Sequence, residues 1–308
     1  MKRWILLCLA ALGGLAACET ILGFEDHELY PPDASVSGQG GAAEAAAGAS
    51  AGGAGGAAGS TGGSAGVSDA GDAADTGPGR VTDGLVALYT FDEGTGTTVK
   101  DTSGVAPALD LTIDVASSVQ WKTGFLHVLA PVRIRSFVAA QKVFDRCTAS
   151  GEITAEAWLR LDSVVDTSDG AFTPNRIVTM SIDGSNRNFT LGHDEDRWVF
   201  RVRRTGDASG FNGTPGLQTP SGTATLNLAH VVATRAASGL TTAYRDGTEI
   251  ETQNQIGDFS NWDPAYELTL ANELADDRDW LGELHLVAIY DKALSPAEIQ
   301  QNLGAGPN

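Results

Sequence analysis

The stretch ELADDRDW, near the C-terminal end of the chain, places three carboxylates and one guanidinium close together. Asp276, Asp277 and Asp279 supply the carboxylates, Arg278 supplies the guanidinium, and Trp262 lies a short distance before them. Carboxylates and guanidinium groups hydrogen-bond sugar hydroxyls, an aromatic ring stacks on a sugar face, and clustered carboxylates bind calcium. These five residues predict a ligand site for a sugar or for calcium. An exposed, solvated loop is the alternative.

Other residues with catalytic potential do not form a recognisable catalytic pattern. The five histidines lack H-E-x-x-H or any comparable zinc-ligand spacing. Cys147 has no neighbour that would lower its pKa, so we interpret it as a small, partly buried residue. Asp194, Glu195 and Asp196 lie between two runs with strand periodicity, which favours a solvated hairpin turn. We therefore expect a protein that is not an enzyme and requires no cofactor.

Strand periodicity dominates the second half of the chain. Apolar and polar residues alternate in ITAEAWLRL (153–161) and in RWVFRVRR (197–204). In LTTAYRDGTEI (240–250), Asp246-Gly247 separates two such runs, and both residues accept the positive φ of a two-residue hairpin turn. Many short strands with almost no long helical period predict an antiparallel β-sandwich.

The chain closes with a helix signal. Ser295 is a good N-cap, Pro296 fits the first turn, and Glu298 completes a capping box with Ser295. Gly304 is expected to end the helix. This pattern predicts a short structural helix after the last strand.

The first residues have the layout of a secretory signal, with Lys2 and Arg3 before an apolar run and then small residues. Leu15-Ala-Ala-Cys18 resembles the lipobox of bacterial lipoproteins, whose cysteine is acylated. We therefore expect a signal peptide over residues 1–17 and a lipid anchor at Cys18, which attaches the protein to a membrane of the bacterial cell envelope, on its periplasmic or surface side. An ordinary signal with a chance cysteine, or an uncleaved anchor, is the alternative.

Residues 18–79 are expected to form a disordered tether. From residue 34 to residue 79 the sequence is rich in Gly, Ala and Ser and contains no aromatic residue. Residues 19–79 also carry nine acidic residues and no Lys or Arg, and residues 80–308 carry 30 acidic against 18 basic residues, a formal charge of −12. This balance excludes a nucleic-acid partner, because such a partner requires a basic surface.

Four blocks together carry a family resemblance: GLVALYTFDEGTGTTVKDTSG (84–104), ITAEAWLRL, LAHVVATRAASGLTTAYRDGTEI (228–250) and WLGELHLVAIYDKALSPAEI (280–299). Their order and spacing resemble the laminin-G-like, concanavalin A-like jelly roll of bacterial surface proteins. The resemblance implies one all-β domain over residues 80–308, an antiparallel two-sheet jelly-roll sandwich with a short C-terminal helix. It also implies that His230 and Trp280 are packed residues.

The same resemblance raises the question of calcium. In many relatives a structural calcium ion joins the first strand to the last, and one ligand is an Asp in a closing G-x-I-D-x-V pattern. His285 occupies that position here, and imidazole is a poor ligand for calcium. Asp92, Glu93 and Asp101 of the opening block remain candidate metal ligands. Ordinary turn capping by these residues is the alternative.

These observations predict a surface-anchored lipoprotein whose jelly roll is a non-catalytic adhesion module for a glycan or a surface protein. Glycan hydrolases of the resembling fold carry an E-x-D-x-x-E pattern on one strand, and no strand-like run here has it. A hydrolase or lyase with a different carboxylate pair is one alternative function. A purely structural envelope component is the other.

Lipid attachment is tested by Cys18→Ala. Several acyl chains on one residue give stable membrane anchoring, so removal of the acceptor sulfur should move the protein from the membrane fraction to the soluble fraction. The measurement is fractionation together with incorporation of labelled fatty acid. A variant that still sediments with membranes, beside a wild type that takes up no label, would disprove the anchor.

Overall fold

The computed structural model describes residues 79–165, 174–208 and 210–307, and every structural statement here refers to them. The predicted signal peptide, Cys18 and all of the predicted tether except Gly79 lie outside these residues. The described residues belong to one compact unit, Asp69–Asn308. No helix within them is long and apolar enough to cross a membrane.

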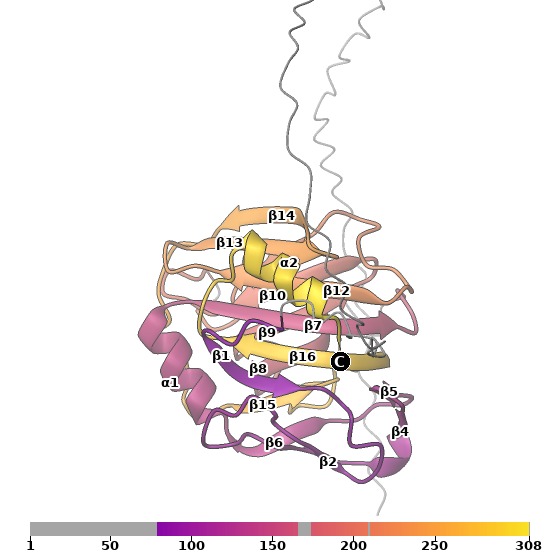
Figure 1. The fold of residues 1–308 in the computed structure, drawn as a ribbon. Coiled ribbons are helices and arrows are strands. Elements are labelled where there is room, and N and C mark those ends of the chain that lie inside the picture. Colours follow the sequence, from indigo (N-terminus) through magenta and orange to yellow (C-terminus); the bar gives the residue numbers. More distant parts are fainter. Residues whose placement is uncertain (1–78, 166–173, 209, 308) are drawn as a thin grey trace, which may run out of the picture. The chain divides into compact units, whose positions relative to one another are not determined.

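Sixteen strands form two antiparallel sheets of eight, one lying behind the other in Figure 1. Sheet A contains, in order, β14 (Thr248–Asn254), β13 (Leu240–Arg245), β12 (Ala229–Arg235), β7 (Ile153–Leu161), β16 (Gly282–Tyr290), β5 (Phe125–Val128) and β4 (Val119–Lys122), with β1 (Leu85–Tyr89) paired to β16. Sheet B contains β11 (Leu217–Gln218), β10 (Arg197–Val202), β9 (Arg187–Asp194), β8 (Asn175–Ser181), β15 (Glu267–Leu270), β6 (Ile134–Ala139), β3 (Leu111–Ile113) and β2 (Thr98–Val99). The helices are η1 (Ala116–Ser118), α1 (Gln141–Ser150) and α2 (Pro296–Ala305).

The main core lies between the inner faces of the two sheets. From sheet A it includes Ala155 and Leu159 of β7, and from sheet B it includes Met180, Phe189 and Phe200, all with at most 1% of their surface exposed. Because side chains alternate along a strand, the residues between these positions point to the outer faces. The predicted all-β jelly-roll sandwich is confirmed.

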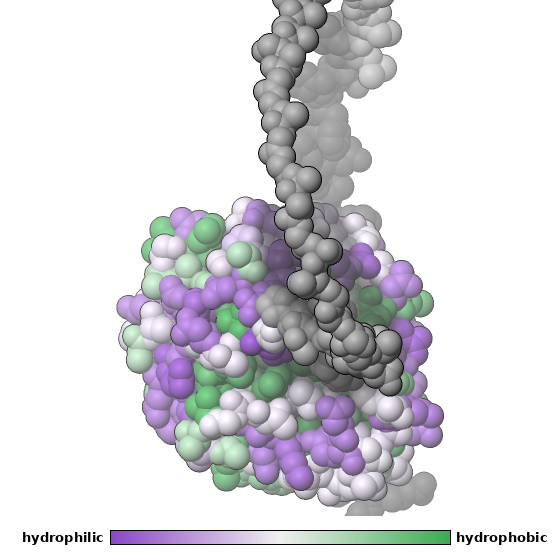
Figure 2. All heavy atoms as spheres, in the orientation of Figure 1, coloured by the Kyte–Doolittle hydropathy of each residue, from purple (hydrophilic) through white to green (hydrophobic). Residues whose placement is uncertain are grey.

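Helix α2 covers the outer face of sheet A (Figure 1). Ile299 of α2 packs in a second apolar cluster with Val232, Leu286 and Tyr290 of the sheet. On the side of the molecule that carries α2, hydrophilic and intermediate residues separate the hydrophobic patches (Figure 2). The outer face of sheet A is thus closed by a part of the chain itself.

The predicted capping box of α2 is present, but the helix ends later than the sequence suggested. The Ser295 hydroxyl accepts a hydrogen bond from the Glu298 backbone N–H, and the Glu298 carboxylate accepts one from the Ser295 N–H at 2.8 Å. Gly304 lies inside the last turn. The helix ends at Ala305, and Gly306 follows it with a positive φ of +73° and an N–H that donates to the Leu303 carbonyl.

A buried carboxylate connects α2, sheet A and the start of the domain. Glu156 of β7 has no exposed surface and forms an ion pair with Arg80. Its carboxylate also lies 2.8 Å from His230 Nε2 and accepts a hydrogen bond from Asn302 Nδ2 at 2.7 Å. Asn302 Oδ1 in turn accepts the Val81 N–H at 2.8 Å. His230 is therefore a packed residue, as expected.

Helix α1 was not predicted. It lies at one edge of the sandwich (Figure 1) and buries Lys142, Val143 and Cys147. Burial raises the pKa of the Cys147 thiol, which agrees with an inert, packed cysteine. The expected hairpin turns are present, because Glu195 and Asp246 both adopt positive φ between paired strands.

Asn302→Ala tests the connection between the two ends of the domain. The change removes the hydrogen bonds to Val81, Glu156 and Tyr290 and leaves a buried carboxylate oxygen and a buried N–H without partners. We expect the free energy of unfolding to fall by about 2–4 kcal/mol, measured by urea denaturation. Gln300→Ala, which removes one exposed hydrogen bond from the same helix to the Gly247 carbonyl, is the control and should change it by less than about 1 kcal/mol. Equal losses in the two variants would contradict the assignment.

Candidate functional site

The outer face of sheet B is polar although it is buried. The strand register places Thr269 of β15, Thr179 of β8, Thr190 of β9 and Arg201 of β10 side by side across four strands. The three threonines have no exposed surface and Arg201 has 9%. Thr179 and Thr190 share a hydrogen bond of 2.6 Å between their hydroxyls. A row of hydroxyls that ends at a guanidinium suits a polar ligand better than an apolar one.

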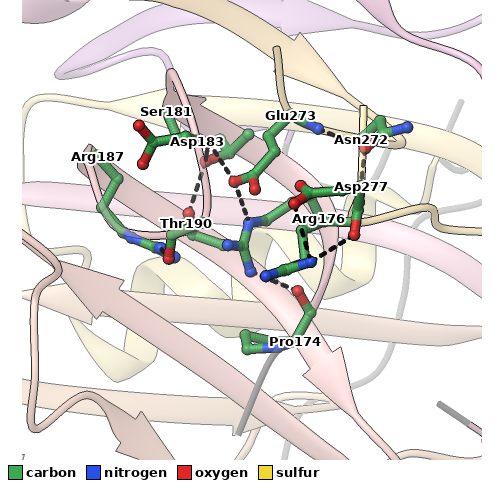
Figure 3. Close-up of polar contacts among 12 residues, drawn as sticks. Pro174, Arg176, Ser181, Asp183, Arg187, Thr190, Asn272, Glu273 and Asp277 are labelled. Atoms are coloured by element: carbon green, nitrogen blue, oxygen red, sulfur yellow. Dashed lines mark hydrogen bonds and ion pairs between the residues drawn. The ribbon is translucent and has the colours of Figure 1, made fainter. Parts of the chain in front are cut away.

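Four arginines gather on this face and are called the arginine cluster: Arg176 of β8, Arg187 at the start of β9, Arg201, and Arg278 from the loop between β15 and β16. Glu273, from the same loop, points into the cluster (Figure 3). Arg176 Nε donates to Glu273 Oε2 at 3.0 Å, and both side chains are at least 99% buried. Ser181 Oγ donates to the same oxygen at 3.0 Å. Arg176 and Glu273 thus form a buried ion pair at the centre of the site.

Arg187 has no comparable ion pair among the described residues. Its Nη2 donates to the Gly184 carbonyl, while Nε and Nη1 are buried and have no hydrogen-bond partner. Arg278 lies beside it, because a Cβ atom added to Gly184 would lie 2.8 Å from Arg278 Nη2. A side chain at position 184 would therefore displace Arg278, so this glycine allows the two arginines to approach the same turn.

The arginines of the cluster lower one another's pKa values. Burial, followed by repulsion from Arg176 and Arg201, lowers the pKa of Arg187 to about 8. Burial also lowers the pKa of Arg176 to about 10, although Glu273 opposes the shift. The pKa of Glu273 is raised by burial, against the effect of Arg176. Glu273 is fully buried, whereas the other acidic residues around the cluster, Asp183, Asp194, Asp207 and Asp277, are half-buried or exposed.

A pocket of about 260 Å³ opens beside Arg201. Its volume is close to the lower end of the range for small-molecule sites. It is lined by Asp194, Val199, Arg201, Thr214, Pro215, Gly216 and Gln218. Carboxylate, guanidinium, hydroxyl and amide groups therefore meet at an opening next to the cluster.

Asn272 organises the acidic loop that the sequence singled out. Its Nδ2 donates to Asp276 Oδ1 at 2.9 Å and to Asp279 Oδ1 at 2.6 Å, and its Oδ1 accepts the Arg278 N–H at 3.0 Å. Burial and the neighbouring Asp276 raise the pKa of Asp279. Asp277 is exposed and pairs with Arg278 at 3.2 Å. Of the predicted loop residues, Arg278 is the one that joins the arginine cluster.

Trp262 lies in the core and not in the ligand loop. It is 5% exposed, its ring stacks on Phe259 with centroids 4.5 Å apart, and its Nε1 donates to the Arg203 carbonyl at 2.7 Å. The sequence suggested a ring that stacks on a sugar. Tertiary packing buries that ring, so it is not available for the predicted contact.

The three candidate metal ligands, Asp92, Glu93 and Asp101, make contacts with different neighbours. Glu93 Oε1 accepts the Lys100 N–H at 2.7 Å, and Asp92 lines a surface hollow of about 520 Å³ together with Trp121 and Lys122. Within residues 79–165, 174–208 and 210–307, no group of three or more His, Cys, Asp or Glu side chains is arranged to hold a metal ion. Asp92, Glu93 and Asp101 therefore do not form such a group here.

Asp101 is a turn residue that pairs with a buried lysine of the same domain. It forms a buried ion pair with Lys142 of α1, and it accepts backbone N–H groups from Leu88, Ser103 and Leu109 at 3.0–3.2 Å. Burial alone would raise the pKa of Asp101, but the hydrogen bonds from Lys142 and Leu109 outweigh burial and lower it. These contacts are the turn capping that the sequence left open as the alternative.

His285 contacts neighbours on sheet A. Its ring stacks on Phe125 with centroids 4.7 Å apart, and its Nε2 lies 3.3 Å from Glu283 Oε2. Burial lowers the pKa of His285, while Glu283 opposes the shift. Arg160 Nε donates to the same Glu283 oxygen at 2.8 Å. His285 is thus part of a surface ion-pair network.

Comparison with known proteins identifies the family. Residues 138–300, more than half of the chain, match a laminin-G-like family model described as the concanavalin A-like lectin/glucanases superfamily. The chain belongs to this superfamily. The expected resemblance is therefore confirmed, and the site lies on the outer face of one sheet of a concanavalin A-like sandwich. A search of curated proteins finds no significant match.

Solved structures agree on the fold. The binding domain of botulinum neurotoxin DC in complex with rat synaptotagmin II gives a TM-score of 0.52 at 15% identity, with 73% of this chain and 52% of that chain covered. Trypanosoma rangeli sialidase in complex with sialic acid gives 0.50 at 15% identity, with 71% and 32% covered. The chain thus spans about a third of the sialidase and half of the toxin domain. At these identities the similarity shows the fold alone.

Asp101→Asn tests the internal ion pair. Removal of the carboxylate leaves Lys142 buried without its counter-charge, so we expect a loss of about 3–5 kcal/mol in the free energy of unfolding at neutral pH. Because the folded-state pKa of Asp101 is lowered, its contribution is present above the unfolded pKa near 4 and is lost as the pH falls through the folded pKa. The difference between wild type and variant should shrink below about pH 4, as measured by urea denaturation.

Calcium provides the control for this prediction. The wild type should show the same Tm in chelator and in millimolar calcium, because Lys142 already neutralises Asp101. A rise in Tm with calcium that Asp101→Asn abolishes would instead assign Asp101 to a metal site.

Proposed function

We propose that the protein is a lipid-anchored, non-catalytic binding module that presents the outer face of sheet B to a glycan or a surface protein. One observation carries the proposal. The outer face of sheet A is closed by α2, whereas that of sheet B carries hydroxyls, four arginines and a pocket. Such polar groups are retained on a buried sheet face at a cost in stability, which a binding role explains.

The arrangement of carboxylates supports a non-catalytic role. Glycoside hydrolysis uses two carboxyl groups that face each other across the scissile bond. Strands β8 and β10 contain no acidic residue, and the fully buried carboxylate of the site, Glu273, is ion-paired with Arg176. Among the described residues, the lining of the pocket beside Arg201 contains one carboxylate, Asp194, whereas glycoside hydrolysis needs a facing pair.

The family and the neighbouring structures favour glycan or protein recognition. The superfamily is described as lectins and glucanases, and the neighbours are named in complexes with sialic acid and with synaptotagmin. A purely structural envelope component would not require an arginine cluster beside a pocket. The cluster therefore favours binding over a structural role.

The entry point of the chain agrees with display from a membrane anchor. Arg80 and Val81, which follow the predicted tether, are fixed on the outer face of sheet A by Glu156 and Asn302. The arginine cluster lies on the outer face of the other sheet. A tether from Cys18 would thus join the domain on one face and leave the opposite face for the ligand.

Arg201→Ala tests this proposal, with the lipidated full chain screened in detergent micelles on an array of glycans and envelope proteins. We expect the wild type to bind a subset of the array, and we expect Arg201→Ala to weaken that binding roughly tenfold or more, because charged hydrogen bonds contribute about 1.5–3 kcal/mol each. Arg146→Ala is the matched control. It removes an arginine of α1 that pairs with Asp291, and the variant should bind as the wild type does.

Two results would contradict the proposal. Absence of binding to every arrayed ligand would favour the structural alternative. Release of reducing sugars from a bound glycan would show that the protein is an enzyme.

A further inference from the structure

We propose that the arginine cluster binds the carboxylate of an acidic sugar, such as a uronic acid, with Arg187 as the main contact to the anion. The inference rests on the proposed function and narrows its ligand to one chemical class. It is based on the buried atoms of the face that lack hydrogen-bond partners. Arg187 contributes donors to this group of atoms, whereas Glu273 Oε1 is an acceptor.

This face carries buried polar side-chain atoms without hydrogen-bond partners, and two of them belong to one guanidinium, that of Arg187. Among the described residues they include Arg187 Nε and Nη1, Arg278 Nε, Glu273 Oε1 and Thr269 Oγ1. More than nine in ten buried polar groups in folded proteins have a partner, so several unsatisfied atoms on one face indicate a missing polar group. The described part of the chain offers these atoms no partner.

The missing group includes an anion. A guanidinium has only donors, and three of the five unsatisfied atoms belong to guanidinium groups. Arg187 is fully buried and forms no ion pair with a described carboxylate, and its charged neighbours are three arginines, Glu273 and Asp183. Water could satisfy the N–H groups but would not neutralise the charge. An anion would do both, through short charge-assisted hydrogen bonds.

The missing group also includes hydrogen-bond donors. In its ionised form, paired with Arg176, Glu273 accepts hydrogen bonds only at Oε1, and it would repel an anion that carries no donor of its own. Hydroxyl groups on the same ligand would satisfy Glu273 and would also reach the Thr269 hydroxyl. An acidic sugar combines one planar carboxylate with several hydroxyls. Inorganic sulfate lacks the second feature at neutral pH.

The pocket beside Arg201 supplies room for the rest of the ligand. Its volume of about 260 Å³ and its lining by Asp194, Thr214 and Gln218 suit a neighbouring sugar ring. Arg201 and Arg278 keep partial exposure, 9% for the first residue and 18% for the second side chain. Arg187 itself does not line this pocket and has no exposed surface, so Arg201 or Arg278 would have to move aside for the carboxylate to reach it.

The test is calorimetric titration of the lipidated full chain in detergent micelles with oligogalacturonate and with its methyl ester. The two probes share one sugar backbone, and esterification removes the negative charge of each carboxyl group and adds a methyl group to it. We expect the wild type to bind the acid and not the ester, with an affinity that falls as salt is added. Arg187→Met should weaken binding of the acid roughly ten- to hundredfold. Arg146→Met, at the distant pair with Asp291, should leave it unchanged.

A Tm measurement separates a binding role of Arg187 from a structural one. Removal of a buried cation that has no ion pair should leave the Tm of the unliganded protein unchanged or raise it. A lower Tm that accompanies the loss of binding would assign Arg187 a structural role and overturn the inference.

Other outcomes distinguish this inference from the proposed function. Equal binding of acid and ester would overturn the carboxylate assignment but leave a glycan-binding module. If dextran sulfate binds as tightly and its binding also depends on Arg187, the site is a general anion site and the carboxylate assignment is wrong. If oligogalacturonate binds only after the nine acidic residues within 19–79 are changed to amides, the occupant is the chain's own tether and the inference fails.

Discussion

The carboxylate of Glu156 holds the two ends of the domain on one sheet. It is fully buried, and its partners are Arg80 at the start of the domain, His230 on the neighbouring strand and Asn302 in the last helix. A buried charge is stable only when it is paired and hydrogen-bonded, so these partners must be present together. The pKa of Glu156 is lowered despite its burial, since the hydrogen bond from His230 and the charge of Arg80 outweigh desolvation. This constraint fixes α2 on the outer face of sheet A.

The outer faces of the two sheets differ in how completely their buried polar groups are hydrogen-bonded. On sheet A the polar network around Glu156 is nearly complete, and apolar residues of α2 pack around it. On sheet B the Arg176–Glu273 pair is satisfied only on one side, because one glutamate oxygen and two nitrogens of the adjacent Arg187 lack partners. The network around Glu156 stabilises the first face, although His230 Nδ1 and Trp158 Nε1 lack hydrogen-bond partners among the described residues. The less complete network of sheet B makes the second face less stable than it would be with an apolar surface, and a ligand can recover that difference.

The sequence was sufficient for the fold because the fold depends on local patterns. The alternation in ITAEAWLRL predicted which residues of β7 face the core, and the capping box at Ser295 predicted the start of α2. Helix α1 was missed because it is short and has no capping side chain, so its burial depends on sheet contacts that no local pattern records. The position of Gly304 failed as a helix end for a similar reason, since Gly306 also adopts a positive φ and follows the last helical residue instead.

The site could be predicted only in part, because it depends on strand register. Arg176, Arg187 and Arg201 lie on three neighbouring strands, and of the three only Arg201 falls in a run whose alternation the sequence showed, residues 197–204. Register places Arg201 opposite Thr190 and Ser181 opposite Arg187, which gathers the charges. Arg278 was singled out correctly as a loop residue, but its partner is this arginine cluster and not Trp262, which the core buries. An arginine that is buried beside other arginines costs free energy in the unliganded protein, and only a comparison of stability with binding can show what offsets that cost.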